Sequence, residues 1–253
     1  MNWLRRWRRQ RLLRRHAFGD AAWERATHDL HALRHLTPSQ HTRLREAATL
    51  IAAEKDFLQP GGAPLPEAQI ARVAALAALP VLELGLDWYR GWHSVIVYPT
   101  GFVARHTVED EAGVVHEVRE DLSGEAWDAG PVILAWEDVL DAGAADGYNV
   151  VLHEFAHKLD MANGEANGMP PLHRGMSRAA WTAAFTAAWE DLQRRADAGL
   201  PLVVDAYALE APEECFAVMT EAFFERPQAL AEAYPAVYRQ LVAFYRQDPG
   251  GRT

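Results

Sequence analysis

Two histidines and one glutamate near the middle of the chain form the pattern His-Glu-x-x-His, whose residue types and spacing suit metal binding. His153 and His157 are four residues apart, so on a helix they stand one above the other and can present both imidazoles to one ion. Glu154 lies about 100° around such a helix from His153, which keeps it off the ion but within reach of a water molecule beside it. The spacing therefore predicts a zinc site, with one ion per chain.

The residues around this motif predict that it is buried. The segment from Asn149 to Asp160 is otherwise almost entirely apolar, with Val150, Val151, Leu152, Phe155, Ala156 and Leu159. Buried imidazoles and carboxylates are costly without partners, and one metal ion would satisfy them together. The apolar context therefore favours a metal site over a chance arrangement of polar residues.

A third protein ligand is expected, because catalytic zinc sites usually combine three ligands with one open position. The downstream candidates are Glu210, Glu213, Glu214 and Glu221. Pro212 fits the first position of a helix, which places Glu213 and Glu214 in the first turn, where the helix dipole alone already favours acids. Glu213 is expected to do no more than this, whereas Glu214 shares a helix face with Glu221. Spacing does not separate Glu214 from Glu221 or Glu210.

Asp160 follows His157 by three residues on the same helix face. Three ligands along one helix span too much axial distance, so Asp160 is expected to accept a hydrogen bond beside the site rather than to bind the ion. Gly164 and Gly168 predict sharp turns after the motif helix.

A second pair of histidines, His31 and His35, is also four residues apart but has no glutamate between them. These residues are expected to form a surface cluster on a helix, and a second metal site is the alternative.

Charge is unevenly distributed along the chain. The net charge is −10, and residues 1–15 hold seven arginines and no acid, which leaves −17 on the rest. This strong negative charge on the rest of the chain argues against direct nucleic-acid binding. The arginine-rich segment lacks the apolar stretch of a secretory signal, and we expect it to fold back onto the acidic body or to stay mobile. The alternative is a helix at a membrane surface, because Trp3, Leu4, Trp7, Leu12 and Leu13 interleave with the arginines.

The composition is that of a soluble, globular protein, which we expect to be cytoplasmic. Hydrophobic residues make up 49% of the chain and nine are Trp, which argues against intrinsic disorder. No apolar run of about 18 or more residues occurs, so no membrane-spanning helix is expected. The single cysteine, Cys215, excludes an internal disulfide.

Periodicity and breakers predict helices, then a small sheet, then helices again. The first helices lie between Asp20 and Lys55, with a break at Thr37-Pro38, and near 67–79. Strands are expected at His93–Tyr98, Phe102–Val108, Val114–Glu120 and Val132–Trp136. Later helices are expected near 146–161, 177–197, 213–225 and 227–247. This order predicts a helix-rich α+β fold.

We expect one domain over residues 1–253, because the loop at 59–66 is short for a linker. Within it, residues 1–18 form the basic segment, 19–80 a helical N-terminal part, and 81–253 the sheet and the catalytic helices.

Two motifs extend the interpretation to a known family: His-Glu-Phe-Ala-His-Lys-Leu-Asp from His153, and Tyr207 followed by Glu-Cys-Phe-Ala-Val from Glu214. In both, the chain resembles the Mlc titration factor A family, bacterial zinc metallopeptidases of the glucose-regulation system. The His-Glu-Phe-x-His string and a Tyr seven residues before a Glu are also similar to the catalytic domain of anthrax lethal factor. Less specific similarity covers most of the chain, including the stretch from Gly130 and the Phe-Phe-Glu-Arg-Pro that ends at Pro227.

The resemblance implies a role for each matching residue. His153, His157 and Glu214 would be the zinc ligands, Glu154 the general base and Tyr207 the electrophilic helper. It also implies a zincin-like fold, in which the motif helix lies beneath a small, mostly antiparallel sheet. By position, Val132–Trp136 is the expected edge strand, which would bind an extended peptide by strand addition.

The resemblance implies that the protein is an aminopeptidase that hydrolyses peptide bonds and that it binds the Mlc-type glucose repressor. The alternative is a regulatory protein without catalytic activity that sequesters a transcription repressor and holds zinc only as a structural ion. A set of two His, two Glu and one Tyr is more than a structural zinc site needs, which favours the enzyme.

Overall fold

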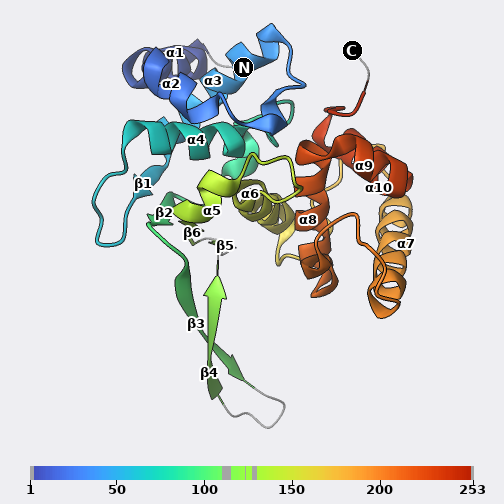
Figure 1. The fold of residues 1–253 in the computed structure, drawn as a ribbon. Coiled ribbons are helices and arrows are strands. Elements are labelled where there is room, and N and C mark those ends of the chain that lie inside the picture. The colour runs from blue at the N-terminus through green and yellow to red at the C-terminus, as the bar shows by residue number, and fades with distance from the viewer. Residues whose placement is uncertain (1–2, 110–114, 123, 127–129, 252–253) are drawn as a thin grey trace.

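Helices, a small sheet and further helices follow one another along the chain, as predicted for a helix-rich α+β fold (Figure 1). The computed structural model describes residues 3–109, 115–122, 124–126 and 130–251. The first helices are α1 (Trp3–His16), α2 (Asp20–Thr27), α3 (Pro38–Glu54) and α4 (Glu67–Ala78), with a short 3-10 helix η1 (His31–Leu33) between α2 and α3.

The predicted break before Pro38 is a helix start with both of its expected bonds. The Thr37 hydroxyl accepts the backbone N–H of Gln40, and the Gln40 side chain accepts the backbone N–H of Thr37. This reciprocal pair satisfies two donors that a helix start leaves unpaired, and Pro38 lacks the N–H that would be a third.

The arginine-rich segment forms α1, which packs against α3. Arg9 donates to Glu46 of α3 at 3.4 Å. The chain therefore places part of its basic N-terminal segment against an acidic residue of the body.

Arg72 of α4 is buried and joins the first helices to a later one, α5 (Trp136–Asp141). Its guanidinium donates to the backbone carbonyls of Val139, Leu140 and Ala142 at the end of α5. It also donates to the carbonyl of Ala26 and to the carboxylate of Asp29. All of these bonds offset the cost of burying the charge.

The sheet has four strands in the order β1-β2-β6-β5, and a separate two-stranded sheet is formed by β3 and β4. Their bounds are β1 (Asp56–Leu58), β2 (Ser94–Tyr98), β3 (Phe102–Glu109), β4 (Val115–Leu122), β5 (Gly124–Ala126) and β6 (Val132–Ala135). The backbone of the β3–β4 hairpin extends away from the helices (Figure 1).

The prediction of a mostly antiparallel sheet is wrong. In the four-stranded sheet, β1 pairs with β2 in parallel and β2 pairs with β6 in parallel, and of its described strands only β5 is antiparallel to its neighbour. Parallel neighbours need long crossover connections, and α4 lies between β1 and β2 while the β3–β4 hairpin lies between β2 and β6. β1, β2 and β6 are therefore not joined to one another as successive hairpins.

The assignment of Val132–Trp136 as the edge strand is also wrong. The strand there, β6, ends at Ala135, and Trp136 begins α5. β6 pairs with β2 on one side and with β5 on the other, so it lies inside the sheet. In the described chain the strand next to it, β5, ends the sheet on this side.

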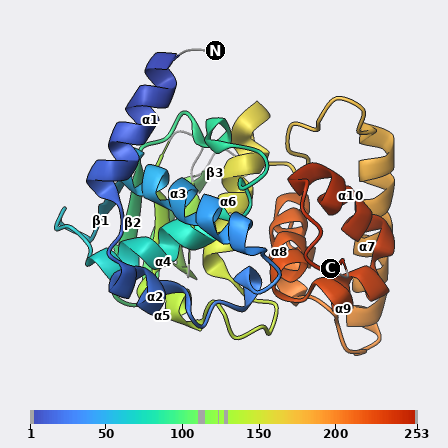
Figure 2. The same ribbon diagram turned by 90° about the horizontal axis from the view of Figure 1, so that it is seen from above.

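The later helices are α6 (Val150–Asp160), α7 (Arg178–Asp197), α8 (Pro212–Glu225), α9 (Pro227–Ala233) and α10 (Pro235–Tyr245). The single helix predicted near 227–247 is thus two, because Pro235 cannot continue α9 and instead starts α10. α6 contacts β5, β6 and α4 on one side and α8 on the other, and Figures 1 and 2 show it between the sheet and α8.

One cluster of buried side chains connects the sheet with both sets of helices. It includes Leu76 of α4, Val97 of β2, Phe155 of α6, Phe216 of α8 and Phe244 of α10. The motif helix therefore lies in the centre of the core, as its apolar sequence predicts. Within the described residues, no helix has both the length and the apolar character needed to cross a membrane.

Candidate functional site

The motif helix α6 begins at a well-capped position. Asn149 precedes its first residue, and the Asn149 side-chain oxygen accepts the backbone N–H of Leu152 at 3.1 Å. His153 follows Asn149 by four residues, and His157 follows one turn later on the same face of the helix. The centroids of the two imidazole rings are 4.8 Å apart. The sequence thus produces the predicted pair of neighbouring imidazoles.

The helix that faces this pair is α8, which starts at Pro212 as predicted. Glu214 lies in its first turn, where a carboxylate is also favoured by the helix dipole. The turn that follows α6 fits closely against the start of α8: a Cβ at Gly168 would come within 2.4 Å of the Pro212 carbonyl oxygen. Only glycine allows this approach, so Gly168 fixes where α8 begins relative to α6.

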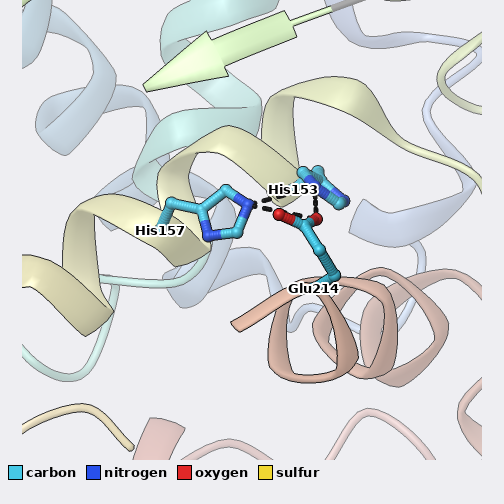
Figure 3. Close-up of side chains that lie close together, drawn as sticks. All are labelled: His153, His157 and Glu214. Atoms are coloured by element: carbon cyan, nitrogen blue, oxygen red, sulfur yellow. Dashed lines mark hydrogen bonds and ion pairs between the residues drawn. The ribbon is translucent and has the colours of Figure 1, made fainter. Parts of the chain in front are cut away.

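The three side chains converge on one point between α6 and α8 (Figure 3). Nε2 of His153 lies 2.9 Å from Oε2 of Glu214 and 3.1 Å from Nε2 of His157. Nε2 of His157 lies 3.4 Å from the same carboxylate oxygen. Among the described residues, this is the one group of three or more His, Cys, Asp or Glu with ligand atoms close enough to hold a metal ion.

Glu221, one of the alternative ligands, has a different position. It lies two turns beyond Glu214 on α8, and its Oε1 contacts Nδ1 of His153 at 2.8 Å. Its other oxygen accepts the backbone N–H of Asn149. A carboxylate at Nδ1 accepts the proton there and leaves the Nε2 lone pair of His153 directed at the cluster.

A further carboxylate, Glu225, continues this network one turn along α8. The side chain of Asn149 donates to Oε1 of Glu225 at 2.7 Å. Burial raises the pKa of Glu225 to about 7, although the bond from Asn149 acts to lower it, and the second oxygen has no hydrogen-bond partner among the described residues. Asn149 therefore connects the start of α6 to two acids of α8.

The cluster of His153, His157 and Glu214 is strongly polarised. Burial acts to raise the pKa of Glu214, but its bonds to His153 and His157 outweigh this and lower it to about 2. Burial acts to lower the pKa of His153, and its bonds to Glu214 and Glu221 again outweigh it, so that pKa is held well above the usual value. Because a metal ion binds only the deprotonated imidazole, an ion that entered this cluster would displace the proton that the carboxylates favour on His153.

Glu154 lies beside the cluster, and it is 4% exposed. Burial raises its pKa to about 7, and its Oε2 has no hydrogen-bond partner among the described residues. The neighbouring His153 and His157 act in the opposite direction on the same pKa. Glu154 is therefore a carboxylate that can exchange a proton near neutral pH.

Asp160 is not part of the cluster, in agreement with its expected place beside the site. Its Oδ2 accepts the backbone N–H groups of Asn167 and Gly168 at 2.8 and 2.7 Å. Gly164 and Gly168 both have positive φ, 137° and 76°, which confirms the predicted turns. Asp160 thus holds the turn whose Gly168 contacts the start of α8.

Tyr207 lies next to His153, in the short 3-10 helix η4 (Ala206–Leu209). Its ring centroid is 6.0 Å from that of His153, and the side chain is 47% exposed. The Asp205 side chain caps η4 by accepting the Tyr207 backbone N–H at 2.8 Å. The phenol therefore stands next to the cluster and in contact with solvent.

The donor set fits a metal ion. Two imidazole nitrogens and one carboxylate oxygen are the ligands typical of a catalytic zinc site. Tetrahedral zinc with bonds of about 2.0–2.2 Å separates its ligand atoms by about 3.3–3.6 Å. The distances in the cluster are within about half an ångström of this range, so small outward shifts would make room for the ion.

The other acids and histidines weighed from sequence lie outside the cluster. Glu210 is exposed and Glu213 is half-buried in the first turn of α8, as the dipole effect alone would explain. His31 lies in η1, so His31 and His35 do not share one helix, and no metal-binding group forms around them among the described residues. The carboxylates of Glu221 and Glu225 were recognisable as a stripe with Glu214, at spacings of seven and four residues on an otherwise apolar helix.

Known proteins match the chain over most of its length. The family described as glucose-regulated metallo-peptidase M90 matches residues 4–246. Mlc titration factor A of Klebsiella pneumoniae (strain 342) is 39% identical over 229 residues, which are 90% of this chain and 86% of the relative. The protein of the same name from Yersinia enterocolitica is 40% identical over 235 residues, which are 92% of this chain and 87% of the relative. The protein of that name from Salmonella agona (strain SL483) is 40% identical over 222 residues, which are 86% of this chain and 83% of the relative.

These matches confirm the family that the two motifs indicated. They include the motif helix, the ligand cluster and Tyr207 within one family match. The chain therefore belongs to the glucose-regulated metallopeptidase family M90, the family of the Mlc titration factors A.

Proposed function

We propose that this protein is a zinc-dependent peptidase and that it acts as an aminopeptidase. The observation that carries the proposal is the convergence of His153, His157 and Glu214, with nitrogen and oxygen atoms 2.9–3.4 Å apart, beside the buried carboxylate of Glu154. These three residues would hold the ion. Zinc in such a site activates water and polarises a carbonyl group.

The residues around the ligands divide the remaining chemistry. Glu154 accepts a proton from the attacking water and passes it to the nitrogen of the leaving amine. The Tyr207 hydroxyl donates a hydrogen bond to the oxyanion that develops on the scissile carbonyl. The loss of one such donor typically lowers the rate about 10²–10³-fold. Glu221 keeps the His153 ring in the tautomer and orientation that binding requires.

The peptide is proposed to bind along β5. This strand ends the sheet in the described chain, its backbone contacts α6, and it runs antiparallel to β6. An extended peptide can add to such an edge through main-chain hydrogen bonds.

The test combines metal content with activity. Purified protein should contain about one zinc per chain, and His157→Ala should lose it. Glu154→Gln should retain the zinc, because Glu154 is not among the converging atoms, but should lose hydrolysis of aminoacyl and peptide substrates. Full activity of Glu154→Gln would contradict the mechanism. Equal rates on free and N-acetylated peptides would contradict the exopeptidase assignment while leaving the zinc site intact.

A second function is proposed from the name of the relatives, Mlc titration factor A. We propose that this chain binds an Mlc-type repressor and that binding does not require catalysis. Glu154→Gln should then bind the purified repressor as the unaltered protein does. Loss of binding in this variant alone would instead connect repressor capture to the catalytic site.

A further inference from the structure

The outer face of α1 carries two exposed tryptophans surrounded by arginines. Trp3 is 73% exposed and Trp7 is 57% exposed, and they are the two most exposed large hydrophobic side chains that the structure describes. Positions 3, 7, 11 and 14 share one face of the helix, so Arg11 and Arg14 stand beside the two indoles. The Arg11 guanidinium lies 5.6 Å from the centroid of the Trp7 ring.

The opposite face attaches α1 to the body. Leu12 and Leu13 are half-buried, and Arg9 donates to Glu46 of α3. Figure 2 shows α1 at the margin of the molecule, with its first turns extending beyond the helices that it packs against. The tryptophan face is therefore directed away from the body, and the fold of the described chain does not cover it.

The charges around this face are only slightly neutralised. The side chains of Arg6, Arg8, Arg9, Arg11, Arg14 and Arg15 are described, and only Arg9 among them takes part in an ion pair with a described residue. The rest of the sequence carries a net charge of −17 beyond residue 15. The molecule thus has one positive end on a strongly negative body.

A negatively charged layer next to an apolar one matches both features of this face. Indole rings prefer the boundary between water and acyl chains, and arginines interact with the phosphates of anionic lipids. An acidic protein or a nucleic acid would use the arginines but would not need two exposed indoles one turn apart. The negative body would be repelled by the same surface, which orients the molecule with α1 toward it.

We propose that the outer face of α1 binds the surface of an anionic lipid bilayer. The helix lies in the interface, with Trp3 and Trp7 inserted at the level of the head groups and Arg11 and Arg14 on the phosphates. Binding here leaves the metal cluster untouched, because α6 and α8 lie away from α1 (Figure 2).

The full-length protein should be sedimented with phosphatidylcholine vesicles that contain about 30% phosphatidylglycerol, and with vesicles of phosphatidylcholine alone. We expect the partition coefficient to be at least about tenfold higher on the anionic vesicles, and to fall at 0.5 M NaCl, since each basic residue near an anionic surface contributes roughly fivefold. Trp3→Ser/Trp7→Ser and Arg11→Gln/Arg14→Gln should each lower it at least about tenfold.

The matched control is Leu140→Ser/Leu200→Ser, which removes two apolar side chains that are each 52% exposed elsewhere on the surface. It should bind anionic vesicles like the unaltered protein. Circular dichroism and zinc content, unchanged in all variants, would exclude misfolding as the cause of lost binding. Failure to sediment with anionic vesicles, or equal binding by the double tryptophan variant, would overturn the proposal, and capture by acidic peptides alone would assign the arginines to a protein partner.

Discussion

The two histidines of the candidate metal centre are positioned by different means. The ring of His153 is held through Nδ1 by Glu221, which also accepts the N–H of Asn149. Nδ1 of His157 has no hydrogen-bond partner within the described ranges. On that side, the turn closed by Asp160 instead brings Gly168 against the start of α8.

This difference separates two ways of building one site. The His153 side depends on which atoms accept hydrogen bonds, so a change of carboxylate to amide should disturb it even when the shape is kept. The His157 side depends on how closely two backbones approach, so a change of volume should disturb it even when no polar atom is altered. The following substitutions test that division, from the largest expected effect to the smallest.

Glu221→Gln should give the largest loss. Glu221 uses one oxygen for His153 and the other for the N–H of Asn149, and an amide offers only one acceptor for these two donors. We expect zinc affinity to fall about 10–100-fold, as is typical when the partner of a ligating histidine is lost. Competition with a chromogenic chelator measures it. Unaltered affinity would show that Glu221 does not position His153.

Gly168→Ala should be next. Its φ of 76° disfavours any side chain, and the new Cβ would meet the Pro212 carbonyl at 2.4 Å. We expect the free energy of unfolding to fall by about 2 kcal/mol and zinc affinity to drop by less than in Glu221→Gln. Thermal and urea unfolding measure the first effect.

Gly164→Ala is the matched control for this glycine, because it also has positive φ, 137°, but has no atom within 4 Å of the added Cβ. It should lower stability while leaving zinc affinity unaltered. If both variants lose affinity equally, the approach of Gly168 to α8 is not what sets the position of Glu214.

Glu225→Gln should stabilise the protein in a pH-dependent way. The folded-state pKa of Glu225, about 7, is above its ordinary value of 4.5, so the folded protein holds this proton more tightly than the unfolded chain. Stability from Glu225 is present at low pH and is lost as the pH rises from about 4.5 through 7. The variant should therefore exceed the unaltered protein by less than about 1 kcal/mol near pH 5 and by roughly 3 kcal/mol at pH 8. Urea unfolding at both pH values is the measurement, and a gain at pH 5 as large as at pH 8 would contradict it.

Asp160→Asn should have the smallest effect. Both backbone N–H groups donate to the same oxygen, Oδ2, so an asparagine can accept both through its single carbonyl. We expect zinc affinity to change less than about threefold, since no hydrogen bond is lost. A loss as large as that of Glu221→Gln would remove the distinction between the two sides.

The sequence predicted those parts of the candidate site whose geometry is local. The four-residue spacing of His153 and His157 and the start of α8 at Pro212 follow from helix geometry and proline chemistry alone. Glu214 and Glu221 could not be separated, because both lie on the same face of α8. Which of the two reaches the cluster depends on the axial position of α8 relative to α6. Contacts between distant segments, such as that of Gly168 with Pro212, set this position.

The sequence predicted the long helices, whose apolar residues repeat over several turns, and it missed the shortest strands. α3, α4, α6, α7 and α8 have enough turns to show an apolar pattern, whereas β1 and β5 have three residues each and show none. The direction of the strands was also predicted wrongly, because the residue pattern of a short strand does not show whether its neighbour is parallel or antiparallel. Tyr234-Pro235 carried the signal for a helix break, which the apolar residues on either side obscured.

The bonds of Arg72 have a consequence for how independently the parts of this chain could be inherited or engineered. The guanidinium closes the last turn of α5 from a helix more than sixty residues earlier. A shortened chain that began at β2 would lose all of these bonds, and it would expose the apolar side chains that pack against Leu76 and its neighbours in α4. The first helices are therefore not a detachable leader, and shuffling them between relatives would need an arginine at this position on each side of the exchange.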